Sequence, residues 1–219
     1  MAKWISFDLY DTLFDRTGLF DCVEAIANEI DGVDAKEART TFADYIADPG
    51  NVIPYVDYDL VLRDALIALD YHFGIKDRAF KRNYFHLIAA LQNLPLFPDV
   101  EHTLKTLINR DYNIAIMANT ADDIVMAHTT KLNLPVTLCT SEMVQTYKPD
   151  IRFFDTLQRE LQFEPDHIHV AANYQTDILP ALEMGWTAIW INRHDDPVPD
   201  TVEPQHQVKS LKGILEFAK

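Results

Sequence analysis

Four polar residues stand directly after short apolar runs or beside a predicted helix start, and their side chains suit nucleophilic chemistry. They are Asp8, Asn119, Lys148 and Asp177. A carboxylate can attack an electrophilic carbon or phosphorus atom and form a covalent ester. A nearby lysine keeps that carboxylate ionised and offsets charge in the transition state. A second carboxylate can hold the lysine in place or activate the water that cleaves the ester.

The apolar runs that precede these residues are typical of strands in a parallel sheet. They lie at residues 3–7, 114–117, 136–138, 168–171 and 188–191. Segments with helical periodicity separate them, and this alternation indicates βαβ units in an α/β fold. Near-continuous apolar strands fit a sheet that is covered on both faces. Because ligands of such sheets bind beyond the carboxyl ends of the strands, we expect the four polar residues to converge on one edge.

One region interrupts the alternation. From Gly18 to Gln92 the pattern is helical throughout, with a turn cluster at Asp48-Pro49-Gly50-Asn51. Pro95 and Pro98 mark the return to the strand and helix pattern. The sequence therefore predicts an all-helical insert placed shortly after the first strand.

These boundaries define the expected domains. Residues 1–14 and 95–219 form a Rossmann-like core, a doubly wound parallel sheet, and residues 15–94 form the inserted helical domain. Within the core, Lys148 is predicted to open a helix. The stretch 193–207 is rich in Asp and Pro and is predicted to be an exposed loop before a last helix.

Composition and charge narrow the class of partner. Hydrophobic residues make up 48% of the chain, which is ample for a packed core. The net charge of −15 and the pI near 4.7 disfavour binding to nucleic acid or to an anionic membrane surface. A small anionic substrate stays compatible with this charge if a local cluster of cations or helix N-termini offsets it.

The sequence also carries signals about compartment and metals. The N-terminal apolar run ends at Asp8, too early for a secretory signal. Cys22 and Cys139 stand alone, which favours reduced thiols in the cytoplasm. The eight histidines show no ligand-like pairing, so we expect no metal site built from them.

Residues 7–14 resemble the first motif of the haloacid dehalogenase-like superfamily, and Asn119, Lys148 and Asp177 follow the order of its later motifs. The helical insert lies where that superfamily carries a helical cap. The resemblance extends over nearly the whole chain and implies a hydrolase with Asp8 as nucleophile. Lys148 then orients and balances Asp8, and Asp177 holds Lys148 or assists the hydrolytic water.

Tyr10 points to one branch of the superfamily. Its phosphatases carry a second Asp two residues after the nucleophile, whereas a tyrosine there resembles the L-2-haloacid dehalogenases. That branch implies metal-free displacement of halide from a small organic acid, by a protein that is often a homodimer. Arg39 and Asn119 then contact the departing halide, although Arg39 on a charged helix face is equally consistent with a salt bridge. Tyr10 either lines the substrate pocket or packs in the core.

Two alanines depart from the superfamily pattern. Ala118 stands where a hydroxyl usually binds the substrate's anionic group, which leaves only backbone N–H groups, and Ala172 replaces an acidic residue that helps phosphatases bind Mg²⁺. A Mg²⁺-dependent phosphatase remains an alternative, with the ion held by Asp8, the backbone of Tyr10 and Asp177, a thin set for an octahedral ion. A catalytically impaired binding protein is the other alternative.

Each of these residues also has a purely structural interpretation. Asp8 and Asp177 can cap a turn or a helix, and the Thr12 hydroxyl can do the same or hydrogen-bond the nucleophile. Asn119 can be a plain turn residue, and Lys148 an exposed lysine. A structure separates these interpretations, because it shows whether the side chains meet.

Overall fold

The computed structural model describes residues 3–163, 167–198 and 202–218. Its internal contacts divide the chain into two units, Met1–Asp15 with Pro95–Lys219 and Arg16–Leu94. The chain leaves the first unit after Asp15 and re-enters it at Pro95. These two residues lie side by side, because the Asp15 backbone N–H donates to the Pro95 carbonyl at 2.9 Å.

The first unit is built on a parallel sheet. Within the described residues the sheet has six strands in the order β3-β2-β1-β4-β5-β6, and every neighbouring pair is parallel. Because β1 lies between β2 and β4, the chain winds outward from it in both directions. The strands are β1 (Lys3–Asp8), β2 (Tyr112–Ala118), β3 (Val136–Thr140), β4 (Ile168–Ala171), β5 (Thr187–Ile191) and β6 (His206–Val208).

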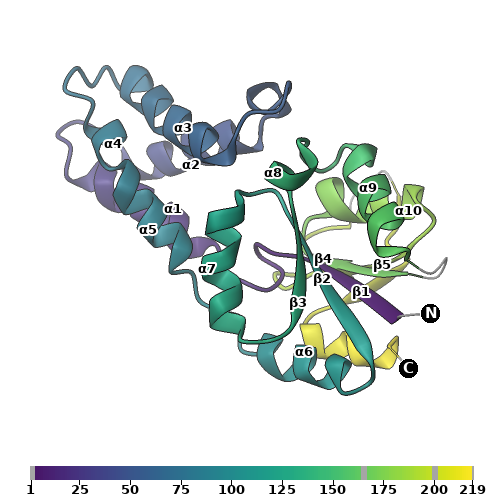
Figure 1. Ribbon diagram of the computed structural model, residues 1–219. Coiled ribbons are helices and arrows are strands. Elements are labelled where there is room, and N and C mark those ends of the chain that lie inside the picture. Colours follow the sequence, from purple (N-terminus) through teal and green to yellow (C-terminus); the bar gives the residue numbers. More distant parts are fainter. Residues whose placement is uncertain (1–2, 164–166, 199–201, 219) are drawn as a thin grey trace. The chain divides into compact units, whose positions relative to one another are not determined.

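Helices cover both faces of this sheet (Figure 1). The helices α6 (Val100–Ile108) and α7 (Asp122–Leu132) lie on one face, and α9 (Ile151–Leu161) and α10 (Leu179–Glu183) lie on the other. Shorter helical turns complete the unit: α8 (Ser141–Val144), the π-helix η2 (Tyr174–Ile178) and the 3₁₀ helix η3 (Leu211–Glu216). The predicted doubly wound α/β fold is therefore confirmed.

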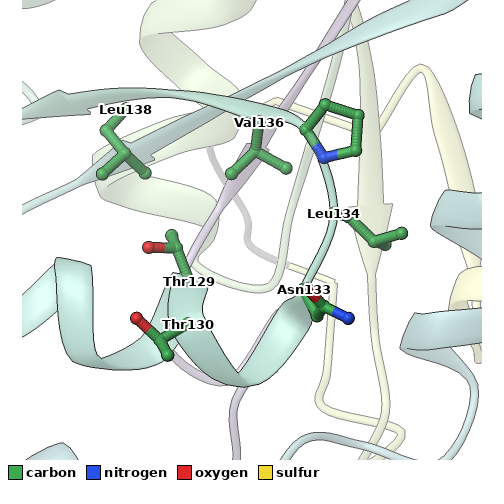
Figure 2. A pocket seen from close by; sticks show the side chains of 7 residues that line it. Thr129, Thr130, Asn133, Leu134, Val136 and Leu138 are labelled. Carbon is green, nitrogen blue, oxygen red and sulfur yellow. The ribbon is translucent and has the colours of Figure 1, made fainter.

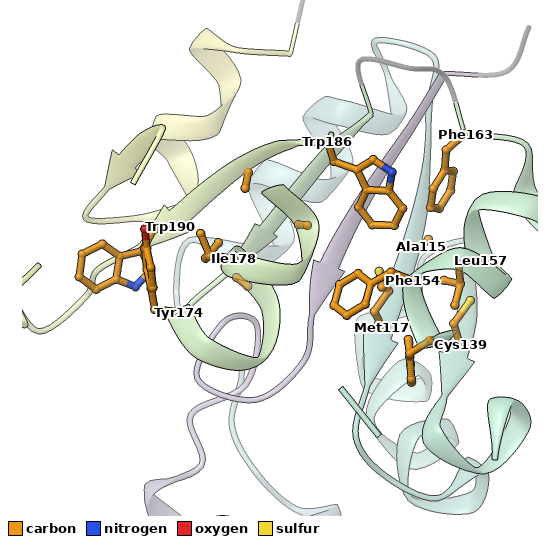
Figure 3. Close-up of a cluster of buried hydrophobic side chains, with 14 residues drawn as sticks. Ala115, Met117, Cys139, Phe154, Leu157, Phe163, Tyr174, Ile178, Trp186 and Trp190 are labelled. Carbon is orange, nitrogen blue, oxygen red and sulfur yellow. The ribbon is translucent and has the colours of Figure 1, made fainter. Parts of the chain in front are cut away.

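The hydrophobic core on the α9 and α10 face is rich in aromatic side chains (Figure 3). Phe154 lies at its centre, fully buried, with its ring centroid 5.8 Å from that of Trp186 and 6.1 Å from that of Phe153. Alternate residues of β2, Ala115 and Met117, point into this cluster, as the period of two in a strand requires. This packing fixes β4 and α9, the elements that flank the candidate site.

The second unit is helical throughout its described length, as expected for the insert. The Asp34 side chain caps one helix by accepting from the backbone N–H groups of Lys36 at 2.9 Å and Glu37 at 3.0 Å. The predicted turn cluster forms a 3₁₀ turn, η1 (Pro49–Asn51). The helices are α1 (Thr17–Asn28), α2 (Ala35–Ala47), α3 (Tyr58–His72), α4 (Ala79–Arg82) and α5 (Tyr84–Gln92).

Some local predictions were wrong. Residues 206–208 form the edge strand β6 rather than the end of a loop, and the last helix is a 3₁₀ helix. Lys148 does not open a helix, because α9 begins at Ile151 with Asp150 as its N-cap. Across the described residues, no helix combines the length and the apolar character that a membrane crossing needs.

Truncating the centre of the aromatic core tests this description. We expect Phe154→Ala to lower the free energy of unfolding by about 3–5 kcal/mol, because it removes a buried ring and leaves a cavity. Urea denaturation gives the measurement. The matched control is Met126→Ala on α7, whose side chain is 60% exposed and should change stability by less than about 0.5 kcal/mol. Equal effects of the two substitutions would contradict the assigned core.

Candidate active site

The strand order brings the predicted polar residues to one edge of the sheet. Asp8 ends β1, Asn119 follows β2, and Asp177 lies in η2 after β4. Lys148 lies in the segment between α8 and α9. Since β2 and β4 flank β1 with their carboxyl ends at the same edge, the side chains meet where the direction of winding changes.

The Lys148 ammonium is the centre of this cluster. Its Nζ donates to Asp8 Oδ1 at 2.7 Å, to the Met117 carbonyl at 2.8 Å and to Asp177 Oδ1. These three acceptors match the three N–H donors of an ammonium group. The Lys148 side chain is 1% exposed, so the structural interpretation as an exposed lysine is wrong. A buried ammonium with paired carboxylates is the arrangement that makes such burial tolerable.

Asp8 is held from both of its oxygens. Oδ2 accepts from the Thr12 hydroxyl at 2.9 Å, and that hydroxyl accepts in turn from the Ala172 backbone N–H at 2.9 Å. Thr12 therefore hydrogen-bonds the Asp8 carboxylate, which was one of its two interpretations. Burial raises the pKa of Asp8, the Lys148 charge opposes this and the Asp177 carboxylate adds to it, with a net raised pKa. The side chain remains 11% exposed, so a small molecule can reach it.

Asp177 is more deeply buried and more acidic. Oδ1 bonds Lys148 and lies 3.4 Å from His169 Nε2, while Oδ2 accepts from the Thr176 hydroxyl at 2.6 Å. Burial alone would raise the pKa of Asp177, but the charge of Lys148 and the hydrogen bond from His169 outweigh it and lower the pKa. Asp177 thus supplies a fixed negative charge beside Lys148.

Those opposing charges act back on the lysine. Burial by itself would lower the pKa of Lys148, but the carboxylates of Asp177 and Asp8 outweigh burial and raise it. The group is therefore an ammonium at neutral pH, and it donates a hydrogen bond to each of the two carboxylates. This arrangement favours ionised Asp8 at the exposed end of the cluster.

Asn119 has a partner that the sequence did not suggest. Its Nδ2 donates to the Lys148 carbonyl at 2.9 Å, and its Oδ1 accepts from the Lys148 backbone N–H at 2.8 Å. The amide therefore fixes the backbone that carries the ammonium. The two residues are 29 positions apart, and no sequence pattern marks such a contact. Ala118, which precedes Asn119, is fully buried at the end of β2.

Tyr10 packs within the first unit and is 8% exposed. Its hydroxyl lies 3.2 Å from the Thr120 hydroxyl, and its ring meets the His128 ring edge-on at a centroid distance of 5.7 Å. Core packing therefore accounts for much of its surface. Thr120 and Thr176 are site residues that the sequence reasoning missed, because short hydroxyl side chains beside a motif carry no signal of direction.

Arg39 belongs to the helical unit, and its contacts lie within that unit. Its Nη1 donates to Asp21 Oδ1 at 2.8 Å and to Glu24 Oε1 at 3.1 Å, and its guanidinium lies 5.2 Å from the Phe20 ring centroid. The hydrogen bond to Asp21 is the main reason that the pKa of Arg39 is raised. Within the described residues all of its hydrogen bonds come from Nη1, and the side chain is 32% exposed.

The cluster does not fit a Mg²⁺ ion. Mg²⁺ requires near-octahedral oxygen ligands, but an ammonium already lies between the carboxylates of Asp8 and Asp177. Both oxygens of Asp177 have donors, and the position that would supply a further carboxylate is Ala172. The described ranges contain no group of three or more His, Cys, Asp or Glu side chains arranged to hold a metal.

A separate surface depression lies away from this cluster (Figure 2). It is lined by residues from the end of α7 to the middle of β3, among them Thr129, Asn133 and Leu138. The lining residues precede β3 or lie in it up to its middle. Asp8 lies at the carboxyl end of β1, and Asp177 follows the carboxyl end of β4. The depression carries no titratable side chain and is not a candidate for the chemistry described above.

The chain resembles known proteins along nearly its whole length. The family described as haloacid dehalogenase-like hydrolase matches residues 5–191. An (S)-2-haloacid dehalogenase of Pseudomonas sp. strain YL is 27% identical over 224 residues, which cover 98% of this chain and 94% of that protein. A pyrimidine 5'-nucleotidase of Streptococcus pneumoniae is 27% identical over 230 residues, which cover 98% and 94%.

A solved structure agrees with these similarities. A crystal structure of a dehalogenase with an intermediate complex is 25% identical and superposes with a TM-score of 0.82. The superposition covers 99% of this chain and 97% of that one. The shared fold therefore includes both units of the chain.

Removing the central ammonium should destabilise the fold in a pH-dependent way. We expect Lys148→Met to lower the free energy of unfolding by about 3–5 kcal/mol at pH 7, because it leaves two buried carboxylates without a cation. Without Lys148 the folded pKa of Asp177 rises above the unfolded value near 4 and the already raised pKa of Asp8 rises further, so stability is lost as the pH rises through and above that value. Urea denaturation at pH 5 and pH 7 should show the larger deficit at pH 7.

Lys105→Met is the matched control for the charge change. Lys105 is 54% exposed in its pair with Glu101, so its loss should cost less than about 1 kcal/mol. A Lys148→Met variant as stable as this control, or one destabilised equally at both pH values, would contradict the role given to the ammonium.

Proposed function

Because the chain belongs to the haloacid dehalogenase-like hydrolases, we propose that it removes halide from a small 2-haloacid without a metal ion, with Asp8 as the nucleophile. The observation that carries the proposal is the buried Lys148 ammonium on Asp8 and Asp177. The Lys148 ammonium stabilises the ionised form of Asp8, so a side chain supplies the positive charge that a metal ion would otherwise provide. Tyr10 stands where an additional carboxylate would serve a phosphatase.

The first step forms an ester. An oxygen of the Asp8 carboxylate attacks C2 of the substrate, a carbon–oxygen bond forms, and the carbon–halogen bond breaks with both electrons leaving on the halide. Thr12 and Lys148 hold the carboxylate by its two oxygens. This orientation lowers the barrier because the nucleophile has little freedom left to lose.

The second step restores the enzyme. Water attacks the ester carbonyl of Asp8, the bond to the substrate oxygen breaks, and the products are a 2-hydroxyacid, a proton and the free carboxylate. The ester carbonyl oxygen of Asp8 gains negative charge in this attack. Lys148 Nζ, which donates to Asp8 Oδ1, stabilises that charge. Both oxygens of Asp177 are engaged by Lys148 and Thr176, which favours a role in holding Lys148 over one in activating water.

We assign the leaving halide and the substrate carboxylate to the remaining residues. Arg39 stabilises the halide through its Nη2, since its contacts with Asp21 and Glu24 use Nη1. Asn119 contributes the second hydrogen of Nδ2, the first being bonded to the Lys148 carbonyl. Backbone N–H groups after Ala118 bind the carboxylate, and the helical unit acts as the cap that carries Arg39.

Phosphatase chemistry is the alternative. Sequence identity does not separate the two activities, since the (S)-2-haloacid dehalogenase and the pyrimidine 5'-nucleotidase are each 27% identical to the chain. The site favours dehalogenation, because an ammonium lies between the carboxylates of Asp8 and Asp177 and Ala172 offers no further ligand for Mg²⁺. A binding protein without catalysis is the other alternative, suggested by Ala118 and Ala172.

We further propose a cytoplasmic enzyme that forms a homodimer. Cys22 and Cys139 are free thiols, which suits a reducing compartment. Burial raises the pKa of Cys139 to about 12, so this thiol resists ionisation and oxidation. Light scattering of the purified protein tests the dimer directly.

Halide release tests the proposed reaction. With L-2-chloropropionate in the presence of EDTA, the wild-type protein should release chloride, and Asp8→Asn should lower the rate by about three orders of magnitude or more. The control is Asp11→Asn, which removes a neighbouring carboxylate at a left-handed φ of 63° that Asn also tolerates. Its rate should stay within a few-fold of wild type.

The other outcomes identify the alternatives. Chloride release that Asp8→Asn does not alter would make the nucleophile assignment wrong. No chloride release, together with phosphate release from a small phosphomonoester that Mg²⁺ stimulates, would establish the phosphatase. If the protein releases neither chloride nor phosphate, the alternative of a binding protein without catalysis is supported.

A further inference from the structure

A chain of buried polar side chains runs through the centre of the sheet to the candidate site. Ser6 on β1 lies beside His169 on β4, and its Oγ is 2.8 Å from His169 Nδ1 and 2.7 Å from His167 Nε2. His169 Nε2 then lies 3.4 Å from Asp177 Oδ1. Ser6 and His169 are fully buried and His167 is 2% exposed, so water does not substitute for these contacts.

Aromatic rings surround the two imidazoles. His167 stacks on Phe163 at a centroid distance of 3.7 Å, and Trp186 meets it edge-on at 4.7 Å. His169 has Phe154 and Trp186 as ring neighbours, each at 6.1 Å. Burial lowers the pKa of His167 to about 3, so this ring is neutral at pH 7. Polar groups in such surroundings carry a cost unless each finds a partner.

The partners determine which nitrogen of each ring carries the proton. A carboxylate accepts hydrogen bonds only, so His169 faces Asp177 with an Nε2–H group. When the ring carries a single proton, Nδ1 is then an acceptor, and it accepts a hydrogen bond from the Ser6 hydroxyl. The Ser6 oxygen is left to accept from His167 Nε2–H, which leaves the buried Nδ1 of that ring without a hydrogen-bond partner. In this row of hydrogen bonds, each donor is directed toward the next residue on the way to Asp177.

We propose that Ser6 and His169 are positioning residues for the Asp8 and Lys148 pair. Ser6 fixes the Nε2–H form of His169, and that N–H group orients the Asp177 carboxylate toward Lys148. In the other neutral form, the lone pair of Nε2 would face a carboxylate oxygen and push it away. The catalytic consequence rests on the proposed dehalogenase function, whereas the proton arrangement does not.

The proton arrangement is tested by the ¹⁵N shifts of the imidazole nitrogens in histidine-labelled wild-type protein and in Ser6→Ala. Both His167 and His169 should be neutral with the proton on Nε2 in wild type. Without the Ser6 hydroxyl, the Nε2–H form of His169 loses its Nδ1 partner, and its Nδ1 signal should shift. A wild-type His169 protonated on Nδ1, or a His169 spectrum unaltered by Ser6→Ala, would overturn the proposal whether or not the protein releases halide.

The kinetic consequence is tested by a matched pair of variants, His169→Leu and His169→Gln. Leucine removes the donor to Asp177, so kcat for chloride release should fall by about ten- to a hundred-fold with KM within about twofold. Glutamine offers an N–H group near the position of Nε2 and should recover most of kcat. Ser6→Ala should lower kcat in the same way. This variant provides the test if His169→Leu does not fold.

A purely structural role predicts a different pattern. Equal losses in His169→Leu and His169→Gln that follow their melting temperatures, or an unaltered kcat in His169→Leu and Ser6→Ala, would overturn the positioning role. If the wild-type protein releases no halide, the proposed function fails, and the ¹⁵N spectra still decide whether the proton arrangement is correct.

Discussion

The buried ammonium of Lys148 is the interaction on which the rest of the site depends. Two carboxylates lie within its reach, and neither Asp8 nor Asp177 could remain ionised at this depth without a compensating cation. Several contacts hold that cation in place. The Met117 carbonyl accepts the third hydrogen bond of the ammonium, and the Asn119 side-chain amide bonds both the N–H and the carbonyl of the Lys148 backbone. The proposed nucleophile is therefore part of a supported ion pair rather than an isolated aspartate.

The parallel sheet explains why this pair forms at all. Because β1 is central, the ends of β2 and β4 deliver their polar residues to either side of Asp8, and the aromatic core behind β4 fixes η2 and with it Asp177. The same scaffold accommodates relatives named as a dehalogenase and as a nucleotidase. In this chain Lys148 is the cation that meets the carboxylates of Asp8 and Asp177.

Much of this arrangement could be predicted from the sequence, and the remainder has physical reasons for escaping prediction. Apolar runs ending in polar residues located the strands and pointed to Asp8 and Asp177, because strand ends in an α/β fold share an edge, whereas Lys148 was expected at a helix start and lies in the segment before α9. The pairing of Asn119 with the Lys148 backbone depends on a loop conformation that no periodicity encodes. The strand β6 was missed because three half-exposed residues leave no apolar run. Ser6 and His169 look like ordinary strand residues until the register aligns them.

Rapid-quench mass spectrometry of the peptide that contains Asp8 tests the central claim most directly. Wild-type protein is mixed with excess L-2-chloropropionate, stopped in acid during the first turnovers and digested. We expect a peptide heavier by one esterified propionate unit, with the modification on Asp8 and its loss on longer incubation without substrate. Chloride release accompanied by an Asp8 peptide of unaltered mass at every time point would contradict it, because the carboxylate would then not be the group that displaces the halide.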